Sequence, residues 1–247
     1  MYINTMGLVL RETAYKESSK ILTILTGTQG KLTVTAHGAL RRNSKLAAAT
    51  QLLALSEMTL FCNRDRWTMT EARSVELFRG LQLDVEKLAL GSYFAELTEA
   101  VADEDSPNQV LLPLCLNSLF ALSEGVKEST YVKPAFALRL MAASGFEPLI
   151  SHCVMCGCEE PERAILDLQG GTLYCAECTR VDGAAIGRGA LQAARHILNC
   201  DQKKLFSFTL GDVSLREIAS AAEGYLLTQL DRRFRTLEFY KQLGVRS

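Results

Sequence analysis

Apolar and polar positions alternate with a period of two along much of residues 6–73. In KLTVTAHG (31–38), Leu32, Val34 and Ala36 alternate with polar neighbours, which predicts a half-buried strand. The preceding SKILTILT (19–26) is rich in β-branched residues, and the glycine-bounded link GTQG (27–30) predicts a hairpin between the two strands. EMTLFC (57–62) and WTMTEA (67–72) predict a second hairpin, with its turn at NRDR (63–66).

GLVLRETAY (7–15) supplies a fifth predicted strand near the start of the chain. Five short antiparallel strands suit a small closed barrel of the OB type better than a sandwich, which needs about seven strands. We therefore predict an OB-fold domain over residues 1–80.

Beyond Ser74 the apolar spacing becomes helical. The segment 83–101 places one apolar stripe opposite its acidic residues, and the stripe contains Leu83, Leu90, Phe94, Leu97 and Val101. Further helices are predicted over 131–145, closed by Gly145, over 189–199 after Gly187, and over 214–234 with Ser214 as the N-cap. The predicted fold class is α+β multidomain, with an all-helical domain over residues 81–247.

The longest apolar-rich stretch, residues 109–122, contains Pro113, Asn117 and Ser118. It is shorter than the roughly 20 residues that a membrane span requires, so we predict a core helix and no membrane partner.

Composition is typical of a folded globular protein, because 48% of the residues are hydrophobic and 22% are charged. The net charge of −1 is divided unevenly: residues 1–80 carry 11 lysines and arginines against 6 acidic residues, and the rest carries 16 against 22. This asymmetry predicts an N-terminal part that faces a polyanion. The start lacks the features of an export signal, so we expect a cytoplasmic protein with reduced thiols.

Five of the eight cysteines lie in two short segments, HCVMCGCEE and GGTLYCAECTR. Cys153 and Cys156 form one C-x-x-C pair, Cys175 and Cys178 form another, and 18 residues separate the pairs. This spacing is typical of a tetrahedral zinc site with four thiolate ligands. We predict one structural Zn²⁺ in an insert at about residues 151–182, which is too small to have a core of its own.

Alternatives to this ligand set remain open in the sequence. Cys158 could replace Cys156 as a ligand, and His152 adjoins a ligand although four cysteines already satisfy the coordination number. A redox motif would use one C-x-x-C near a βαβ pattern, which the doubled pair does not match. Cys62, Cys115 and Cys200 occur singly in apolar contexts, where we expect core residues.

The basic residues of the predicted barrel gather on one strand, the loop after it and the second hairpin turn. The candidates for phosphate binding are Lys31, Arg41, Arg42, Lys45, Arg64 and Arg66. Loops of such a barrel flank the face on which oligonucleotides lie. Tyr15, Phe61 or Trp67 could stack on unpaired bases, unless these rings fill the barrel interior.

Motifs of common enzyme classes do not occur. The chain has no G-x-S-x-G and no P-loop, and GRGALQ (187–192) lacks the third glycine of a dinucleotide fingerprint. A zinc hydrolase would need an open coordination position, which four thiolates do not leave. We therefore predict no catalytic residues and no small-molecule substrate.

An ordered set of motifs resembles the bacterial DNA repair protein RecO family over nearly the whole chain. The segments that carry the resemblance are GLVLRETAYKESSKILTILTGTQGKLTVTAHGALR (7–41), LTEAVADED (97–105), LRLMAASGFEPLISHCVMCG (138–157), GGTLYCAEC (170–178) and LDRRFRTLEFY (230–240).

The resemblance implies an N-terminal OB-fold, a helical domain and a zinc-binding insert. It also implies binding of single- and double-stranded DNA, annealing of complementary strands, and action with RecR to load RecA onto strands coated by single-stranded DNA-binding protein, whose acidic tail the family binds. The four cysteines take the metal role, and Lys31 with the loop of Arg41 and Arg42 takes the DNA role. His37 stands where the family commonly has Lys or Arg before Gly38, so it contributes less to phosphate binding unless it is protonated.

A protein adaptor is the alternative function. In that interpretation the barrel, the bundle and the zinc insert bind partner proteins, and nucleic acid is incidental. Arg232, Arg233 and Arg235 near the last predicted helix end are candidates for contacts with RecR or the acidic tail.

Overall fold

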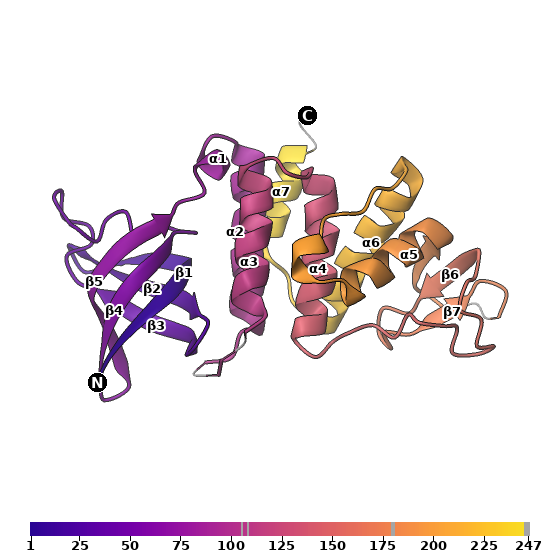
Figure 1. Cartoon of the computed structure of the whole chain (residues 1–247), viewed down its shortest axis with the longest axis horizontal. Coiled ribbons are helices and arrows are strands. Elements are labelled where there is room, and N and C mark those ends of the chain that lie inside the picture. Colours follow the sequence, from indigo (N-terminus) through magenta and orange to yellow (C-terminus); the bar gives the residue numbers. More distant parts are fainter. Residues whose placement is uncertain (105, 108, 179–180, 245–247) are drawn as a thin grey trace. The chain divides into compact units, whose positions relative to one another are not determined.

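The computed structural model describes residues 1–104, 106–107, 109–178 and 181–244 (Figure 1). The chain forms two compact units: unit 1 comprises Met1–Glu124 with Phe234–Ser247, and unit 2 comprises Gly125–Arg233. Among the described residues, no helix has the length and apolar character needed to cross a bilayer.

Unit 1 contains a closed barrel of five strands, which confirms the predicted OB-type fold. The strands are β1 (Tyr2–Tyr15), β2 (Ser19–Thr26), β3 (Gly30–Ala36), β4 (Leu55–Asn63) and β5 (Arg66–Glu76). Their order around the barrel is β1-β2-β3-β5-β4. All pairings are antiparallel except the short parallel contact between β3 and β5. Strand β1 is longer than predicted, because its first half pairs with β4 and its second half with β2.

The period-two pattern explains the barrel interior. Leu32, Val34 and Ala36 on β3 are all buried, and they pack in one cluster with residues such as Met58 and Leu60 of β4. The β4–β5 hairpin closes through Arg64 and Asp65, as predicted for the 63–66 turn. Both turn residues have positive φ, which matches the right-handed twist of the flanking strands.

The described residues of unit 1 also form the helices α1 (Arg79–Gln82), α2 (Val85–Val101), α3 (Leu111–Ser123) and α7 (Arg235–Gly244). Helix α2 begins after Asp84, whose side chain accepts hydrogen bonds from the backbone N–H groups of Glu86 and Lys87. The prediction that Leu83 belongs to the buried stripe was wrong. Leu83 precedes this cap, lies outside the helix, and is 89% exposed.

In its described residues, unit 2 combines three longer helices with a small sheet. The helices are α4 (Ser129–Ala143), α5 (Arg188–Asn199) and α6 (Asp212–Leu230), with the 3₁₀ turn η1 (Gln202–Lys204). As predicted, α4 ends before Gly145, which has φ +83°, and α5 begins directly after Gly187. The predicted N-cap Ser214 was wrong, because α6 begins at Asp212 with Gly211 as its cap.

The sheet of unit 2 lies in the cysteine-rich segment and has the order β7-β6-β8. Its antiparallel strands are β6 (Arg163–Leu166), β7 (Leu173–Cys175) and β8 (Ala184–Gly187). Strand β8 extends the insert beyond its predicted end at residue 182, and residues 179–180 of the insert lie outside the described part of the chain. Compact unit 1 contains residues on both sides of residue 80, where the sequence places a domain boundary, and that boundary stays a prediction.

Candidate functional site

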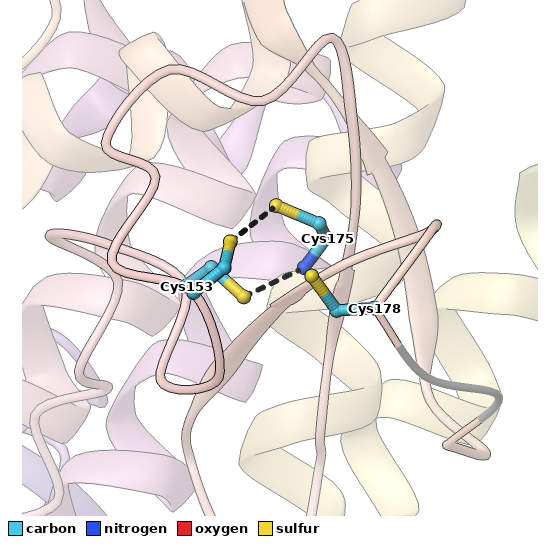
Figure 2. Close-up of side chains that lie close together, drawn as sticks. Cys153, Cys175 and Cys178 are labelled. Atoms are coloured by element: carbon cyan, nitrogen blue, oxygen red, sulfur yellow. Dashed lines mark hydrogen bonds between the residues drawn. The ribbon is translucent and has the colours of Figure 1, made fainter.

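Four cysteines of unit 2 come together in space. The sulfur atoms of Cys153, Cys156, Cys175 and Cys178 all lie within 4.8 Å of one another. The Cys156 and Cys175 sulfurs are 3.7 Å apart, close to the roughly 3.8 Å that a tetrahedral site with Zn–S bonds of about 2.3 Å requires. Figure 2 shows the side chains of Cys153, Cys175 and Cys178 directed toward one another.

Two turns of the backbone position these sulfurs. In the first turn, the Gly157 N–H donates to the Cys153 carbonyl at 2.8 Å, and Gly157 has φ +74°, a conformation that suits glycine. Cys175 ends strand β7, and the Cys178 N–H donates to its carbonyl at 3.1 Å. The Cys175 N–H donates to the Cys153 sulfur at 3.2 Å, which joins the two turns.

The chemistry of these thiols fits a divalent cation. Burial raises the pKa of Cys153, but hydrogen bonds from the Cys175 backbone and from its own turn outweigh burial and lower that pKa to about 6. Burial, then hydrogen bonds to the neighbouring thiols, raise the pKa of Cys175. The hydrogen bond with Cys156, followed by burial, raises the pKa of Cys178 to about 11. Because four thiolates at this spacing repel one another, full deprotonation requires a compensating cation.

Cys158 and His152 lie outside this cluster of four sulfurs. The carbonyl of Cys158 accepts from the Cys153 N–H at 2.8 Å, so its backbone closes the first turn while its side chain is exposed. His152 Nδ1 lies 2.9 Å from Ser151 Oγ. Of the single cysteines, Cys115 is buried as expected, whereas Cys62 and Cys200 are only partly buried.

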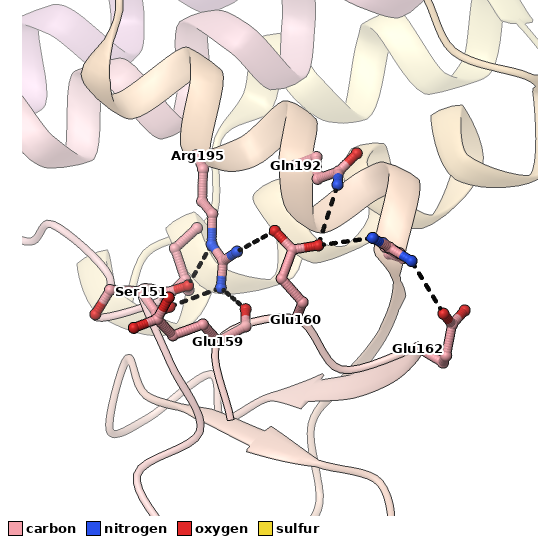
Figure 3. A network of polar contacts seen from close by, with 8 residues as sticks. Ser151, Glu159, Glu160, Glu162, Gln192 and Arg195 are labelled. Atoms are coloured by element: carbon pink, nitrogen blue, oxygen red, sulfur yellow. Dashed lines mark hydrogen bonds and ion pairs between the residues drawn. The ribbon is translucent and has the colours of Figure 1, made fainter. Parts of the chain in front are cut away.

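Arg195 on α5 holds both sides of the first cysteine turn, a contact that sequence reasoning missed (Figure 3). Its guanidinium donates to the carbonyls of Ile150 at 2.8 Å and Ser151 at 2.8 Å, before Cys153, and to that of Glu159 at 2.6 Å, after the turn. The available signal was the spacing of three side chains on one helix: Arg195 lies three residues after Gln192 and seven after Arg188, so the three side chains share one helix face.

Glu160 links the same turn to α5 through ion pairs. Its carboxylate lies 3.0 Å from Arg188 and 4.0 Å from Arg195, and Arg188 also pairs with Glu162 at 3.2 Å. These pairs are half exposed, so each contributes little by itself. The three charge-assisted hydrogen bonds from Arg195 to backbone carbonyls are the stronger restraint.

The basic residues predicted to bind phosphate fall into three places on the barrel. The first is the segment after β3, which contains His37, Arg41, Arg42 and Lys45, all exposed. The Leu40 N–H donates to the Ser18 carbonyl at 3.0 Å, which brings this segment beside the β1–β2 turn. That turn contains Lys16, a cation that sequence reasoning missed, and its ammonium lies 5.2 Å from the centre of the Tyr15 ring.

Within the first place, His37 Nδ1 lies 3.4 Å from Ser19 Oγ. Gly38 has φ +70°, and the Arg41 guanidinium lies against it, so that a Cβ on Gly38 would meet Arg41 Nε at 3.5 Å. In the described part of the chain, Arg41, Arg42 and Lys45 have no ion-pair partner. Their charges are therefore available to an anion.

The second place is the β4–β5 turn, where Arg64 and Arg66 are exposed. Trp67, the next residue, packs partly buried against the barrel interior, so it serves as a core residue more than as a stacking platform. Lys31 occupies the third place. Its ammonium donates to the carbonyl of Glu99 on α2 at 3.0 Å, and its backbone N–H donates to Asp103 at 3.1 Å.

Both parts of the chain match known families. Residues 1–80 match the family described as Recombination protein O N terminal, and residues 82–238 match Recombination protein O C terminal. The chain is 31% identical to the DNA repair protein RecO of Acetivibrio thermocellus over 98% of this chain and 97% of the relative. It is 31% identical to that of Symbiobacterium thermophilum over 97% of each, and 30% identical to that of Alkaliphilus metalliredigens over 98% and 100%. The barrel, the helices and these similarities together show that the chain belongs to the RecO family of DNA repair proteins.

Proposed function

We propose that this chain is a recombination mediator of the bacterial cytoplasm. In this proposal it binds single- and double-stranded DNA, anneals complementary strands and, with RecR, helps load RecA onto strands coated by single-stranded DNA-binding protein. The observation that carries the DNA-binding part is the exposed basic segment at one end of a closed OB-type barrel, where Arg41, Arg42 and Lys45 have no ion-pair partner in the described residues.

The physical role of this surface is to offset phosphate repulsion. Annealing is downhill once two strands can approach, so the chain needs to neutralise backbone charge without hydrolysing anything. Cations at the ends of flexible side chains contact phosphates in any sequence, which suits strands of arbitrary composition. Family membership supports this role.

The cysteine cluster has a supporting role in this proposal. Cys153, Cys156, Cys175 and Cys178 would hold one Zn²⁺, which supplies a structural cross-link and, with four thiolate ligands, no open position for catalysis. The cross-link would hold the cysteine-bearing turn and strand β7 together beside α5.

A salt titration tests the proposed DNA binding. If about five phosphates are contacted on a labelled single strand, log K should fall against log salt with a slope of about −3.5. An annealing assay with complementary strands should show a faster rate with the protein than without it. A slope near zero, or an unchanged annealing rate, would contradict the proposal.

A groove between α2 and α7 favours a second, adaptor function. It has a volume of about 300 Å³ and is lined by Val85, Leu88, Ala89, Ser92, Arg235, Thr236 and Phe239. An apolar groove with an arginine in its lining would suit a tail that is acidic and carries apolar side chains. We propose the acidic tail of single-stranded DNA-binding protein as its occupant.

A labelled tail peptide tests this assignment. We expect Arg235→Ala to weaken peptide binding and to leave oligonucleotide binding unchanged, because the groove is distinct from the basic barrel segment. Equal peptide affinities for Arg235→Ala and the unmodified protein would contradict the assignment.

A further inference from the structure

Two aromatic rings lie together on the outside of the barrel, where they contribute nothing to its interior. Tyr2 on β1 and Phe61 on β4 are register partners, and their ring centroids are 4.7 Å apart with an interplanar angle of 40°. The adjacent residues Ile3 and Leu60 pack toward the barrel interior, so alternation directs Tyr2 and Phe61 outward. Tyr2 is 66% exposed.

This pair has a free aromatic surface. An exposed tyrosine alone needs no explanation, but two rings in contact present a larger rigid face that water solvates poorly. The Cys62 N–H donates to the Met1 carbonyl at 2.9 Å, and this bond holds the two strands together directly beside the pair. The pair is therefore presented in a defined position.

Positive charge adjoins the pair on the same outer face. Phe61 on β4 is paired with Thr68 on β5. Two positions further along β4, Asn63 is paired with Arg66, which lies two positions before Thr68 on β5. Arg66 is therefore on the same face as Phe61 and diagonal to it, a separation that a long side chain spans. In the described part of the chain, neither Arg64 nor Arg66 has an ion-pair partner.

The turn that carries these arginines is conformationally costly. Arg64 has φ 47° and Asp65 has φ 60°, so both occupy the left-handed region, where asparagine and glycine are favoured in two-residue hairpins. Arg64 keeps this left-handed conformation although its long side chain is exposed, which suggests that the side chain serves a ligand.

We propose that Tyr2 and Phe61, with Arg64 and Arg66, form a stacking site for an unpaired base of single-stranded DNA. The base would stack on the exposed Tyr2 ring, and its flanking phosphates would contact the two arginines. A duplex keeps its bases stacked inside, so the site favours single strands over duplexes. This inference rests on the proposed DNA-binding function and assigns it a second contact apart from the segment 37–45.

Fluorescence anisotropy with a labelled oligothymidylate and a labelled duplex tests the stacking. We expect Tyr2→Ala and Tyr2→Leu to weaken single-strand binding about tenfold and to leave duplex binding unchanged, because one stacked base is lost. Tyr2→Phe should bind as the unmodified protein does, since it keeps the ring. Equal affinities for Tyr2→Ala and the unmodified protein, or equal losses on both ligands, would overturn the proposal.

Arg64→Asn separates the ligand role from a role in folding. Asparagine tolerates the left-handed turn, so we expect a higher melting temperature together with weaker single-strand binding. A higher melting temperature with unchanged binding would overturn the role of Arg64. Failure of the unmodified protein to bind any oligonucleotide would instead reject the proposed function as a whole, which distinguishes the two failures.

Discussion

The Nε atom of Arg195 donates a hydrogen bond of 2.8 Å to the backbone carbonyl of Ile150, and this contact ties helix α5 to the approach of the first cysteine turn. The same guanidinium also reaches the carbonyls of Ser151 and Glu159, so one side chain spans the entry and the exit of that turn. The restraint is local to the residues that position Cys153 and Cys156.

We predict that Arg195→Met releases the metal faster than the unmodified protein. Methionine keeps the apolar stem but removes the three donors, so the first turn becomes free to move away from the second pair. Release to a chromogenic chelator should be roughly tenfold faster. Arg188→Met is the matched control, because its partners are exposed carboxylates, and it should change the rate little. Equal rates for both variants would contradict this role of Arg195.

We predict that Lys31→Met destabilises unit 1 and leaves the salt slope of DNA binding unchanged. The Lys31 ammonium is bound to the Glu99 carbonyl near the end of α2, where a cation interacts favourably with the helix dipole. Loss of this contact should lower the free energy of unfolding by about 1 kcal/mol. Urea unfolding and a salt titration measure the two effects. A slope reduced by about 0.7 would instead assign Lys31 a phosphate contact, as the sequence predicts.

Arg41→Ala combined with Arg42→Ala should flatten the salt dependence. Each lost phosphate contact on a single strand removes about 0.7 from the slope, so we expect the slope to become smaller in magnitude by about 1.4. Arg73→Ala is the control on the same barrel, since Arg73 is exposed but paired with Glu57 at 3.0 Å. A double variant whose slope matches that of the control would contradict the proposed interface.

Cys175→Ser should abolish metal binding and loosen the cysteine-rich segment. Serine offers no thiolate, and three ligands close a tetrahedral site poorly, so the bound metal should fall from one equivalent to near zero. Metal content and limited proteolysis of one preparation measure both effects. Cys158→Ser is the matched control and should retain its metal, because Cys158 lies outside the cluster. Metal loss in the control would show that Cys158 is a ligand.

The buried thiol of Cys115 should make stability fall at alkaline pH. Burial raises its pKa to about 12 from an ordinary value of 9.0, against the hydrogen bond with Thr98, which lowers it. As pH rises, the thiol ionises in the unfolded chain before it ionises in the folded chain. The contribution of Cys115 to the free energy of unfolding is therefore complete below pH 9.0 and is lost as pH rises toward 12.

Urea unfolding of the unmodified protein and of Cys115→Ala measures this contribution. Between about pH 8 and about pH 10.5, the unmodified protein should lose about 2 kcal/mol more unfolding free energy than Cys115→Ala does. A difference that does not change with pH would show that the thiol ionises as readily in the folded chain as in the unfolded one.

The sequence was sufficient to predict features that depend on residues close together in the chain. The alternation of Leu32, Val34 and Ala36 was sufficient for β3, because inward positions of a barrel must be apolar. The spacing of the two C-x-x-C pairs was sufficient for the cluster, because each pair forms a turn by itself.

Contacts between distant segments could not be predicted in the same way. Lys31 looked like a free cation on a strand, and only the packing of α2 beside that strand supplies its carbonyl partner. Leu83 fitted an apolar stripe, but the N-cap at Asp84 starts the helix after it, and a capping aspartate overrides the apolar period. Tyr2 and Phe61 are paired across β1 and β4, which are far apart in sequence, and the pattern of one strand alone cannot predict such a pair.

Helix α7 returns to unit 1 after the chain has completed unit 2, and its approach places Phe234 edge-on against Tyr93 of α2, with centroids 5.9 Å apart. Unit 2 is therefore an insertion whose two ends both join the same body. During synthesis, residues 1–124 emerge before α7, so the face of α2 that α7 covers stays uncovered until unit 2 has also been made. A chain that ends at residue 124 would lack α7 and leave α2 uncovered. A deletion of residues 125–233 would instead keep all the segments of unit 1 in one chain.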